Sequence, residues 1–309
     1  MDIFLQQILN GLVLGSIYAL IALGYTMVYG IMGLINFAHG EVVMFGAMVT
    51  ISVVNALIGA GVSLPGPALV LIGMLVAIPS CMLLGYVLER VAYRPLRGAQ
   101  RLAPLITAIG LSIVLQQVAI LIWGRNYIPF PPILGHDVIT IMGASITKLQ
   151  IIIIGLCFAI MTGLLIMVEK TKLGRAMRAT SQNPAVAGLM GVNVNTIISA
   201  TFVLGSALGA VAGVMVATNY DQAHYYMGFM IGLKAFTAAV LGGIGNLGGA
   251  VAGGILLGII ESLGAGYIGQ LTGGFLGSNY QDIFAFMVLI LVLIFRPSGL
   301  LGEKMADRA

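Results

Sequence analysis

Long apolar segments recur along the whole chain, and they limit its fold more than any other feature. A segment of roughly 17 or more apolar residues, wound as a helix, crosses about 30 Å of hydrocarbon. The composition agrees, because 60% of the residues are hydrophobic and 8% are charged, against about 45–50% and about 25% in soluble domains. We therefore predict an all-α polytopic membrane protein with about eight to ten transmembrane helices, some of which could be half-helices. The candidate spans lie near residues 7–29, 41–58, 67–88, 103–123, 149–168, 194–217, 229–244, 248–265 and 281–295.

Most of the cationic residues fall in three short segments. Lysine and arginine in short loops are retained on the cytoplasmic side of a membrane. If the spans alternate, all three segments lie on that side, which predicts an N-terminus outside and a C-terminus in the cytoplasm. The N-terminus carries no cation ahead of the first span, so no cleavable signal peptide is expected. The cations are Arg90, Arg94, Arg97 and Arg101, then Lys170, Lys172, Arg175 and Arg178, and finally Arg296, Lys304 and Arg308.

The 43 glycines lie largely inside the apolar segments. In lipid, small residues allow helix backbones to approach closely, so we interpret the GxxxG steps as packing contacts. Cys81 and Cys157 stand singly in separate spans, and neither a disulfide nor a metal site is indicated. The glycine steps are Gly205, Gly209 and Gly213, Gly11 and Gly15, Gly249 and Gly253, and Gly254 and Gly258.

A polar segment from residue 169 to 195 separates two of the apolar spans. Residues 173–179 can form one or two helical turns. Asn183 followed by Pro184 is a favoured helix start, and Gly191 is a favoured terminator. The sequence thus predicts a second helix of roughly two turns, too short to be stable alone. Its apolar residues either dock on a partner or belong to a solvated connector that folds back on its own chain.

Four segments resemble one family of membrane proteins. The motif GRAMRA followed by NPAVAGLMGV, within residues 174–193, is similar to the cytoplasmic loop of branched-chain amino acid ABC importer permeases. Residues 10–41 resemble the N-terminal signature of the LivH-type permeases. The segments KAFTAAVLGGIGNLGGAVAGG, residues 234–254, and FRPSGLLG, residues 295–302, are also similar to that family. These segments are spread over essentially the whole chain.

This resemblance implies a permease subunit of an ATP-driven importer for branched-chain, hydrophobic amino acids. It would be one transmembrane domain over residues 1–309, in a bacterial inner membrane, forming half of the translocation pathway. The implied partners are a second related permease, two cytoplasmic ATPase subunits and a periplasmic amino-acid-binding protein. No cofactor, metal or nucleic acid is expected. The coupling loop, residues 169–193, would meet an ATPase through Arg175, Arg178, Ala185, Val186, Gly188, Leu189, Met190 and Gly191.

ATP hydrolysis is expected in a partner, because no GxxxxGK[ST] phosphate-binding motif occurs in the chain. Membrane enzymes are disfavoured by the absence of HExxH and GxSxG motifs. The scarcity of charge inside the spans argues against proton coupling. A permease for urea, a short-chain amide or a sugar stays open as an alternative, as does a self-sufficient channel or secondary carrier.

Polar groups at membrane depth are costly and are therefore candidates for the pathway. The hexapeptide NFAHGE, residues 36–41, either caps helices in solvent or forms a broken element that lines a cavity. A second glycine-rich break covers residues 242–249. Lys234 either snorkels to the interface or pairs with Asp221 or Glu261. The predicted pathway residues are Tyr18, Asn36, His39, Glu41, Gln116, Gln117 and Asn246.

Overall fold

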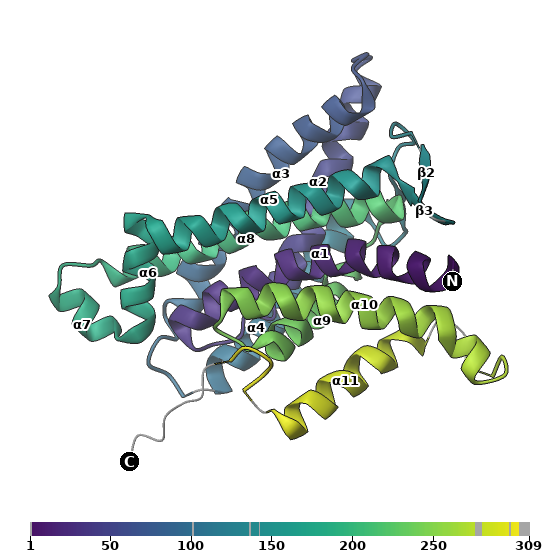
Figure 1. Ribbon diagram of the computed structural model, residues 1–309. Coiled ribbons are helices and arrows are strands. Elements are labelled where there is room, and N and C mark those ends of the chain that lie inside the picture. The colour runs from purple at the N-terminus through teal and green to yellow at the C-terminus, as the bar shows by residue number, and fades with distance from the viewer. Residues whose placement is uncertain are drawn as a thin grey trace. The chain divides into compact units, whose positions relative to one another are not determined.

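The computed structural model describes residues 2–100, 102–135, 137–141, 143–275, 280–296 and 298–302 (Figure 1). Nine of the helices in these ranges are apolar, and each coincides with a predicted span. Seven of the nine are long and apolar enough to cross a membrane, whereas α9 and α11 are shorter. The predicted all-α polytopic class is confirmed. The nine are α1 (Asp2–Met32), α2 (His39–Gly59), α3 (Gly66–Leu88), α4 (Leu102–Trp123), α5 (Lys148–Lys170), α8 (Val194–Tyr220), α9 (Met227–Gly242), α10 (Leu247–Leu271) and α11 (Gln281–Phe295).

The connections carry the remaining elements. A π-helix, η1 (Glu89–Tyr93), continues α3, and the polar segment holds α6 (Lys172–Gln182) and α7 (Pro184–Leu189). Strands β2 (Val138–Ile141) and β3 (Ala144–Thr147) form an antiparallel hairpin before α5. Strands β1 (Ile128–Pro129) and β4 (Gln222–Ala223) also pair antiparallel.

The contacts of the chain group into two compact units. Unit 1 comprises residues 1–26, 136–163 and 234–309, and unit 2 comprises residues 27–135 and 164–233. The predicted organisation as one permease domain stays a prediction. Both cysteines are buried, Cys81 in unit 2 and Cys157 in unit 1, as expected for small core residues.

In unit 1, α1 and α10 pack backbone to backbone through glycines. A Cβ atom added to Gly11 would lie 2.6 Å from the Cα of Ile259, and one added to Gly15 would lie 2.7 Å from the Cα of Ile255. From the other side, a Cβ on Gly258 would lie 2.6 Å from the carbonyl oxygen of Gly11. The close packing predicted for these glycine steps is confirmed.

We expect Gly258→Ala to lower the thermal stability of the detergent-solubilised protein, because the added methyl group overlaps the backbone of α1. Overpacking of this kind costs about 1–3 kcal/mol. The matched control is Gly155→Ala on α5, where an added Cβ has no atom within 4 Å. The measurement is the temperature at which half of the protein loses monodispersity. Equal midpoints for the two variants would contradict the packing assignment.

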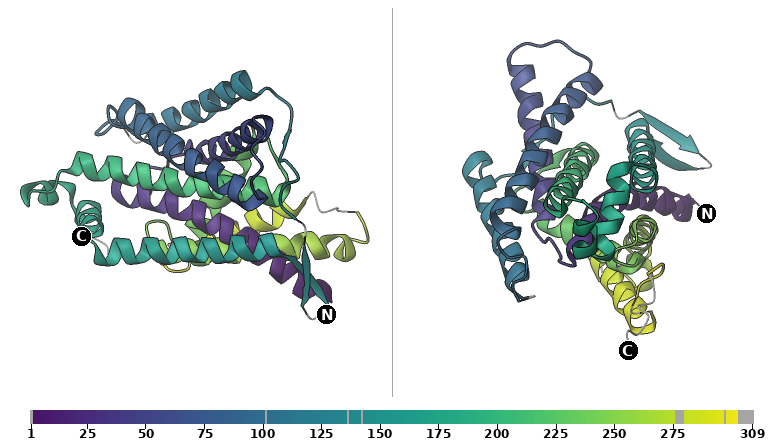
Figure 2. Two further views of the ribbon diagram at one scale, coloured as in Figure 1. Left: turned by 90° about the horizontal axis from the view of Figure 1, so that it is seen from above. Right: turned by 90° about the vertical axis from the view of Figure 1, so that its left-hand side faces the viewer.

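In unit 2, α2, α3 and α8 pack against one another, again at small residues. A Cβ on Gly46 would lie 2.7 Å from the Cα of Ala210, and one on Gly73 would lie 2.9 Å from the Cγ2 of Thr50. Figures 1 and 2 show α6 and α7 at the N-terminal end of α8. The apolar spans thus position the polar segment at one end of their bundle.

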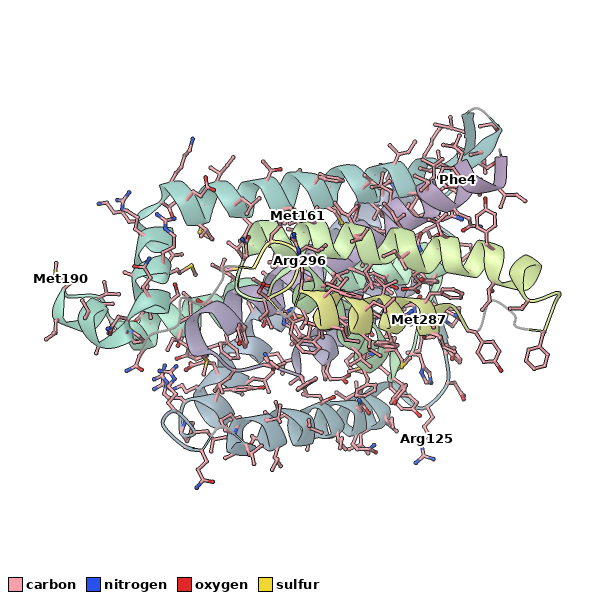
Figure 3. All side chains as sticks on the ribbon, turned by 60° about the horizontal axis from the view of Figure 1, so that its bottom comes forward. Phe4, Arg125, Met161, Met190, Met287 and Arg296 are labelled. Carbon is pink, nitrogen blue, oxygen red and sulfur yellow. The ribbon has the colours of Figure 1, made fainter. Side chains whose placement is uncertain are left out.

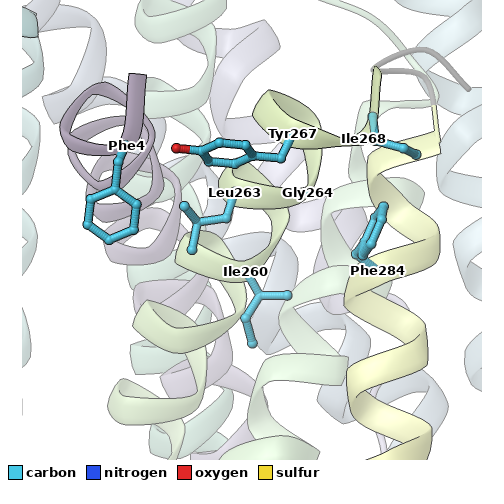
Figure 4. A pocket seen from close by; sticks show the side chains of 7 residues that line it. All are labelled: Phe4, Ile260, Leu263, Gly264, Tyr267, Ile268 and Phe284. Carbon is cyan, nitrogen blue, oxygen red and sulfur yellow. The ribbon is translucent and has the colours of Figure 1, made fainter. Parts of the chain in front are cut away.

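Unit 1 also contains an open apolar pocket of about 400 Å³ (Figure 4). Tyr267 supplies the one side-chain hydroxyl among the residues that line it. The lining is therefore almost entirely apolar. The lining residues are Phe4, Ile260, Leu263, Gly264, Tyr267, Ile268 and Phe284.

Candidate coupling segment and pathway residues

The polar segment forms two helices, each begun by a side-chain cap. Thr171 accepts a hydrogen bond from the backbone N–H of Gly174 at 3.1 Å and starts α6. This helix has 11 residues, so the prediction of one or two turns over residues 173–179 was too short. Asn183 accepts from the N–H groups of Ala185 and Val186 at 3.0 and 3.1 Å and starts α7. The predicted helix start is confirmed.

The end of α7 also follows the sequence. Gly191 has φ 86°, a left-handed conformation that glycine adopts without the strain of a Cβ. The chain therefore turns sharply after Met190, as predicted, and continues into α8.

The apolar side chains of α7 lie on its outer face. Val186, Leu189 and Met190 are 51%, 87% and 80% exposed, whereas Ala187 is 3% exposed. Figure 3 shows Met190 at the outer end of the segment. Only one face of α7 is therefore covered by the described part of this chain, and three large apolar side chains are left for another surface.

Among the other predicted coupling residues, Arg178 makes hydrogen bonds within this chain. The guanidinium of Arg178 donates to the carbonyl oxygens of Val168 and Glu169, the latter at 3.2 Å, at the C-terminal end of α5. These bonds fix the corner between α5 and α6, a structural task that the sequence pattern did not indicate. Arg175, Ala185, Gly188 and Gly191 are exposed, and so is Arg178.

The predicted break between the first two spans is present at residues 33–38. Asn36 lies within it and accepts a hydrogen bond from the Tyr93 hydroxyl at 2.6 Å. Helix α2 then begins at His39. His39 and Glu41 are buried, at 2% and 0% exposure, so neither side chain is a solvated cap. The broken-element interpretation is the one that agrees with this burial.

Glu41 meets α4 through two hydrogen bonds inside unit 2. Its Oε1 accepts from the hydroxyl of Ser112 and from the amide nitrogen of Gln116, both at 2.8 Å. A buried carboxylate requires such donors. The predicted residues Glu41 and Gln116 are therefore brought together, whereas Gln117 is exposed on α4. Ser112 was missed, although its spacing of four residues before Gln116 places both on one helix face.

Tyr18 belongs to a separate polar cluster in unit 1. Lys234 is 9% exposed, and its Nζ lies 2.7 Å from Glu261 Oε1 and 2.8 Å from Asp282 Oδ1. The Tyr18 hydroxyl donates to Glu261 Oε1 at 3.3 Å. The snorkelling interpretation of Lys234 is wrong, because two carboxylates hold the ammonium inside the unit. Pairing with Glu261 was one of the sequence alternatives, and Asp282 was not foreseen.

Asn246 begins α10 and holds the C-terminal segment. Its Oδ1 accepts from the N–H of Gly249, and its Nδ2 donates to the carbonyl oxygen of Leu301, both at 2.9 Å. Gly243 and Gly245, on either side of the turn, have φ 108° and 97°. The second glycine-rich break is thus present, and the geometry of Asn246 is that of a helix cap.

Comparisons with known proteins agree with this architecture. Residues 7–293 match the family described as branched-chain amino acid transport system / permease component. The chain is 44% identical to the high-affinity branched-chain amino acid transport system permease protein BraD of Pseudomonas aeruginosa, covering 99% of this chain and 98% of that protein. It is 45% identical to the permease protein LivH of Escherichia coli K12, covering 99% and 97%.

A more distant relative extends over nearly the same length. The probable branched-chain amino acid transport permease protein LivH of Methanocaldococcus jannaschii is 27% identical, with 97% of this chain and 94% of that protein covered. The nine apolar helices, the capped polar segment and these full-length similarities lead to one assignment: the chain belongs to the family of branched-chain amino acid transport permeases.

Proposed function

We propose that this chain is the membrane-spanning permease subunit of an ATP-driven importer for branched-chain amino acids. The similarity to BraD and LivH, over nearly the full length of all three chains, carries this proposal. The subunit would lie in the inner membrane and form half of the translocation pathway. A second, related permease would form the other half.

The exposed face of α7 supports coupling to a separate ATPase. Val186 and Leu189 of α7 and Met190, the residue that follows it, are exposed, and burial of such side chains contributes about 1.5–3 kcal/mol each. An ATPase subunit with an apolar groove would gain that free energy on docking. Closure of two ATPase subunits around ATP would then displace α7, and α8 would move with it.

The pathway is proposed to pass the break at residues 33–38 and the cluster of Glu41, Ser112 and Gln116. Leucine, isoleucine and valine are zwitterions with apolar side chains. A smooth path with a few hydroxyl, amide and carboxylate groups would orient such a solute without trapping it. High affinity would instead come from a periplasmic binding protein.

The test is reconstitution in liposomes of the complex that co-purifies with the tagged chain. We expect ATPase subunits and a second permease in that complex. We also expect accumulation of radiolabelled leucine that requires ATP and a leucine-loaded binding protein, with no accumulation of labelled urea or ribose. Leucine accumulation by this chain alone would favour a self-sufficient carrier and contradict the proposal. ATP-driven urea or ribose uptake in place of leucine uptake would refute the substrate assignment.

A further inference from the structure

A third buried carboxylate, Glu89, lies at the junction of α3 and the π-helix η1. Its side chain is fully buried and accepts hydrogen bonds from three side chains. Arg94 Nε lies 3.2 Å from Oε1, the Ser199 hydroxyl lies 2.7 Å from Oε2, and the Arg97 guanidinium also donates to Oε1. Arg94 Nη2 in addition donates to the Ser199 oxygen at 3.0 Å. Glu89 therefore joins the loop after η1 to α8.

On the α8 side, this cluster lies close to α7. Asn195, which accepts a hydrogen bond from Arg97, and Ser199 are in the first turns of α8. Asn193 caps α8, because its side chain accepts a hydrogen bond from the backbone N–H of Thr196 at 3.2 Å. The preceding Val192 donates its N–H to the carbonyl oxygen of Ala187 in α7 at 3.0 Å. The start of α8 is thus tied to α7 on one side and to Glu89 on the other.

On the opposite side, η1 reaches the break between α1 and α2. Tyr93 is the last residue of η1 and is 1% exposed. Its hydroxyl donates to Asn36 at 2.6 Å, and its ring packs on Phe202 of α8 with 5.1 Å between centroids. A π-helix is rare and is often found at functional sites. Here Glu89, whose carboxylate binds α8, and Tyr93, whose phenol binds the break, are four residues apart on η1.

We propose that Glu89, Tyr93 and Ser199 form a mechanical linkage that transmits displacement of α7 and the start of α8 to the α1–α2 break. The proposal rests on the proposed function of α7 as the ATPase-docking helix. A buried carboxylate held by two guanidinium groups and a hydroxyl resists separation, because removal of one partner leaves an uncompensated charge. Glu89, the two arginines and Ser199 therefore move together. Glu89 and Tyr93 are positioning residues, since they act on the pathway through Asn36.

The test uses the whole reconstituted complex and measures leucine molecules imported per ATP hydrolysed. Ser199→Ala removes the direct hydrogen bond from α8 to Glu89 and leaves the Arg97–Asn195 contact in place. Tyr93→Phe removes the hydroxyl that donates to Asn36 while keeping the ring on Phe202. We expect each variant to lower the ratio at least fivefold, with ATP hydrolysis stimulated by the loaded binding protein within twofold of the wild type. Because the two contacts act in series, the double variant should have the ratio of the more impaired single variant.

The matched control is Tyr86→Phe in the last turn of α3. It removes a hydroxyl that accepts a hydrogen bond from the Arg90 guanidinium at 2.7 Å. That bond leads to neither α8 nor the break. The Tyr86→Phe variant should therefore import as many leucine molecules per ATP hydrolysed as the wild type. Unchanged ratios in Ser199→Ala and Tyr93→Phe would overturn the linkage, and so would a proportional fall of transport and hydrolysis, which marks a merely structural role. Failure of the wild-type complex to import leucine would instead refute the proposed function.

Discussion

Gly188→Arg is expected to reduce ATP-dependent leucine uptake at least tenfold while the chain still folds and inserts. Gly188 is exposed on α7, and a Cβ added there meets no atom within 4 Å, so this chain has room for a long side chain. In a docked complex, however, the guanidinium would be carried against the ATPase together with the rest of α7, whose Val186 and Leu189 are proposed to enter the ATPase groove. Burying an unpaired charge there is costly.

The measurement combines uptake, ATP hydrolysis and recovery of the ATPase subunits with the tagged permease. We expect weaker recovery and loss of the stimulation by loaded binding protein. Gly59→Arg is the control, because Gly59 is exposed at the C-terminal end of α2 and a Cβ added there also meets no atom within 4 Å. Normal uptake by Gly188→Arg, with full recovery of the complex, would remove the coupling role assigned to α7.

The second large effect is expected for Lys234→Met. This change leaves the carboxylates of Glu261 and Asp282 without their shared ammonium inside unit 1. Breaking a buried ion pair by removing one partner costs about 3–5 kcal/mol, because a desolvated charge is left uncompensated. The variant should therefore lose monodispersity at a much lower temperature than the wild type, or require less denaturing detergent to unfold.

The chain provides a matched control for this change. Lys148 pairs with Asp137 at 2.9 Å, but the two side chains are 61% and 68% exposed. Lys148→Met should cost at most about 1 kcal/mol, because exposed pairs contribute little. The double variant Lys234→Met with Glu261→Gln should regain part of the lost stability. Equal stabilities of Lys234→Met and Lys148→Met would contradict the buried arrangement.

The local patterns of the sequence predicted the local structure well. Hydrophobic length depends only on consecutive residues, and all nine predicted spans are helices. Helix caps also act over two to four residues, so Asn183 and Gly191 could be assigned to the two ends of α7. The glycine steps of α1 and α10 indicated close packing, although they did not say which helix would meet which.

Polar contacts between distant segments could not be assigned from the sequence, and the pairing of Lys234 with Glu261 was only one of three alternatives. Glu261 follows Lys234 by 27 positions, and Ser199 follows Glu89 by 110. Nothing in the residue types around Lys234 distinguishes an ammonium that snorkels from one that is paired. Arg94, Arg97 and Arg178 likewise appeared as loop cations, whereas the structure uses them to hold Glu89 and the end of α5.

The sequence by itself determined that this protein is a bundle of membrane helices with a capped polar segment, because hydrophobic length and capping are properties of short stretches of chain. Only the tertiary structure decided which buried charges are neutralised and by what. Helices far apart in the sequence place those groups together, and a desolvated charge is stable only where a partner lies within a few ångströms.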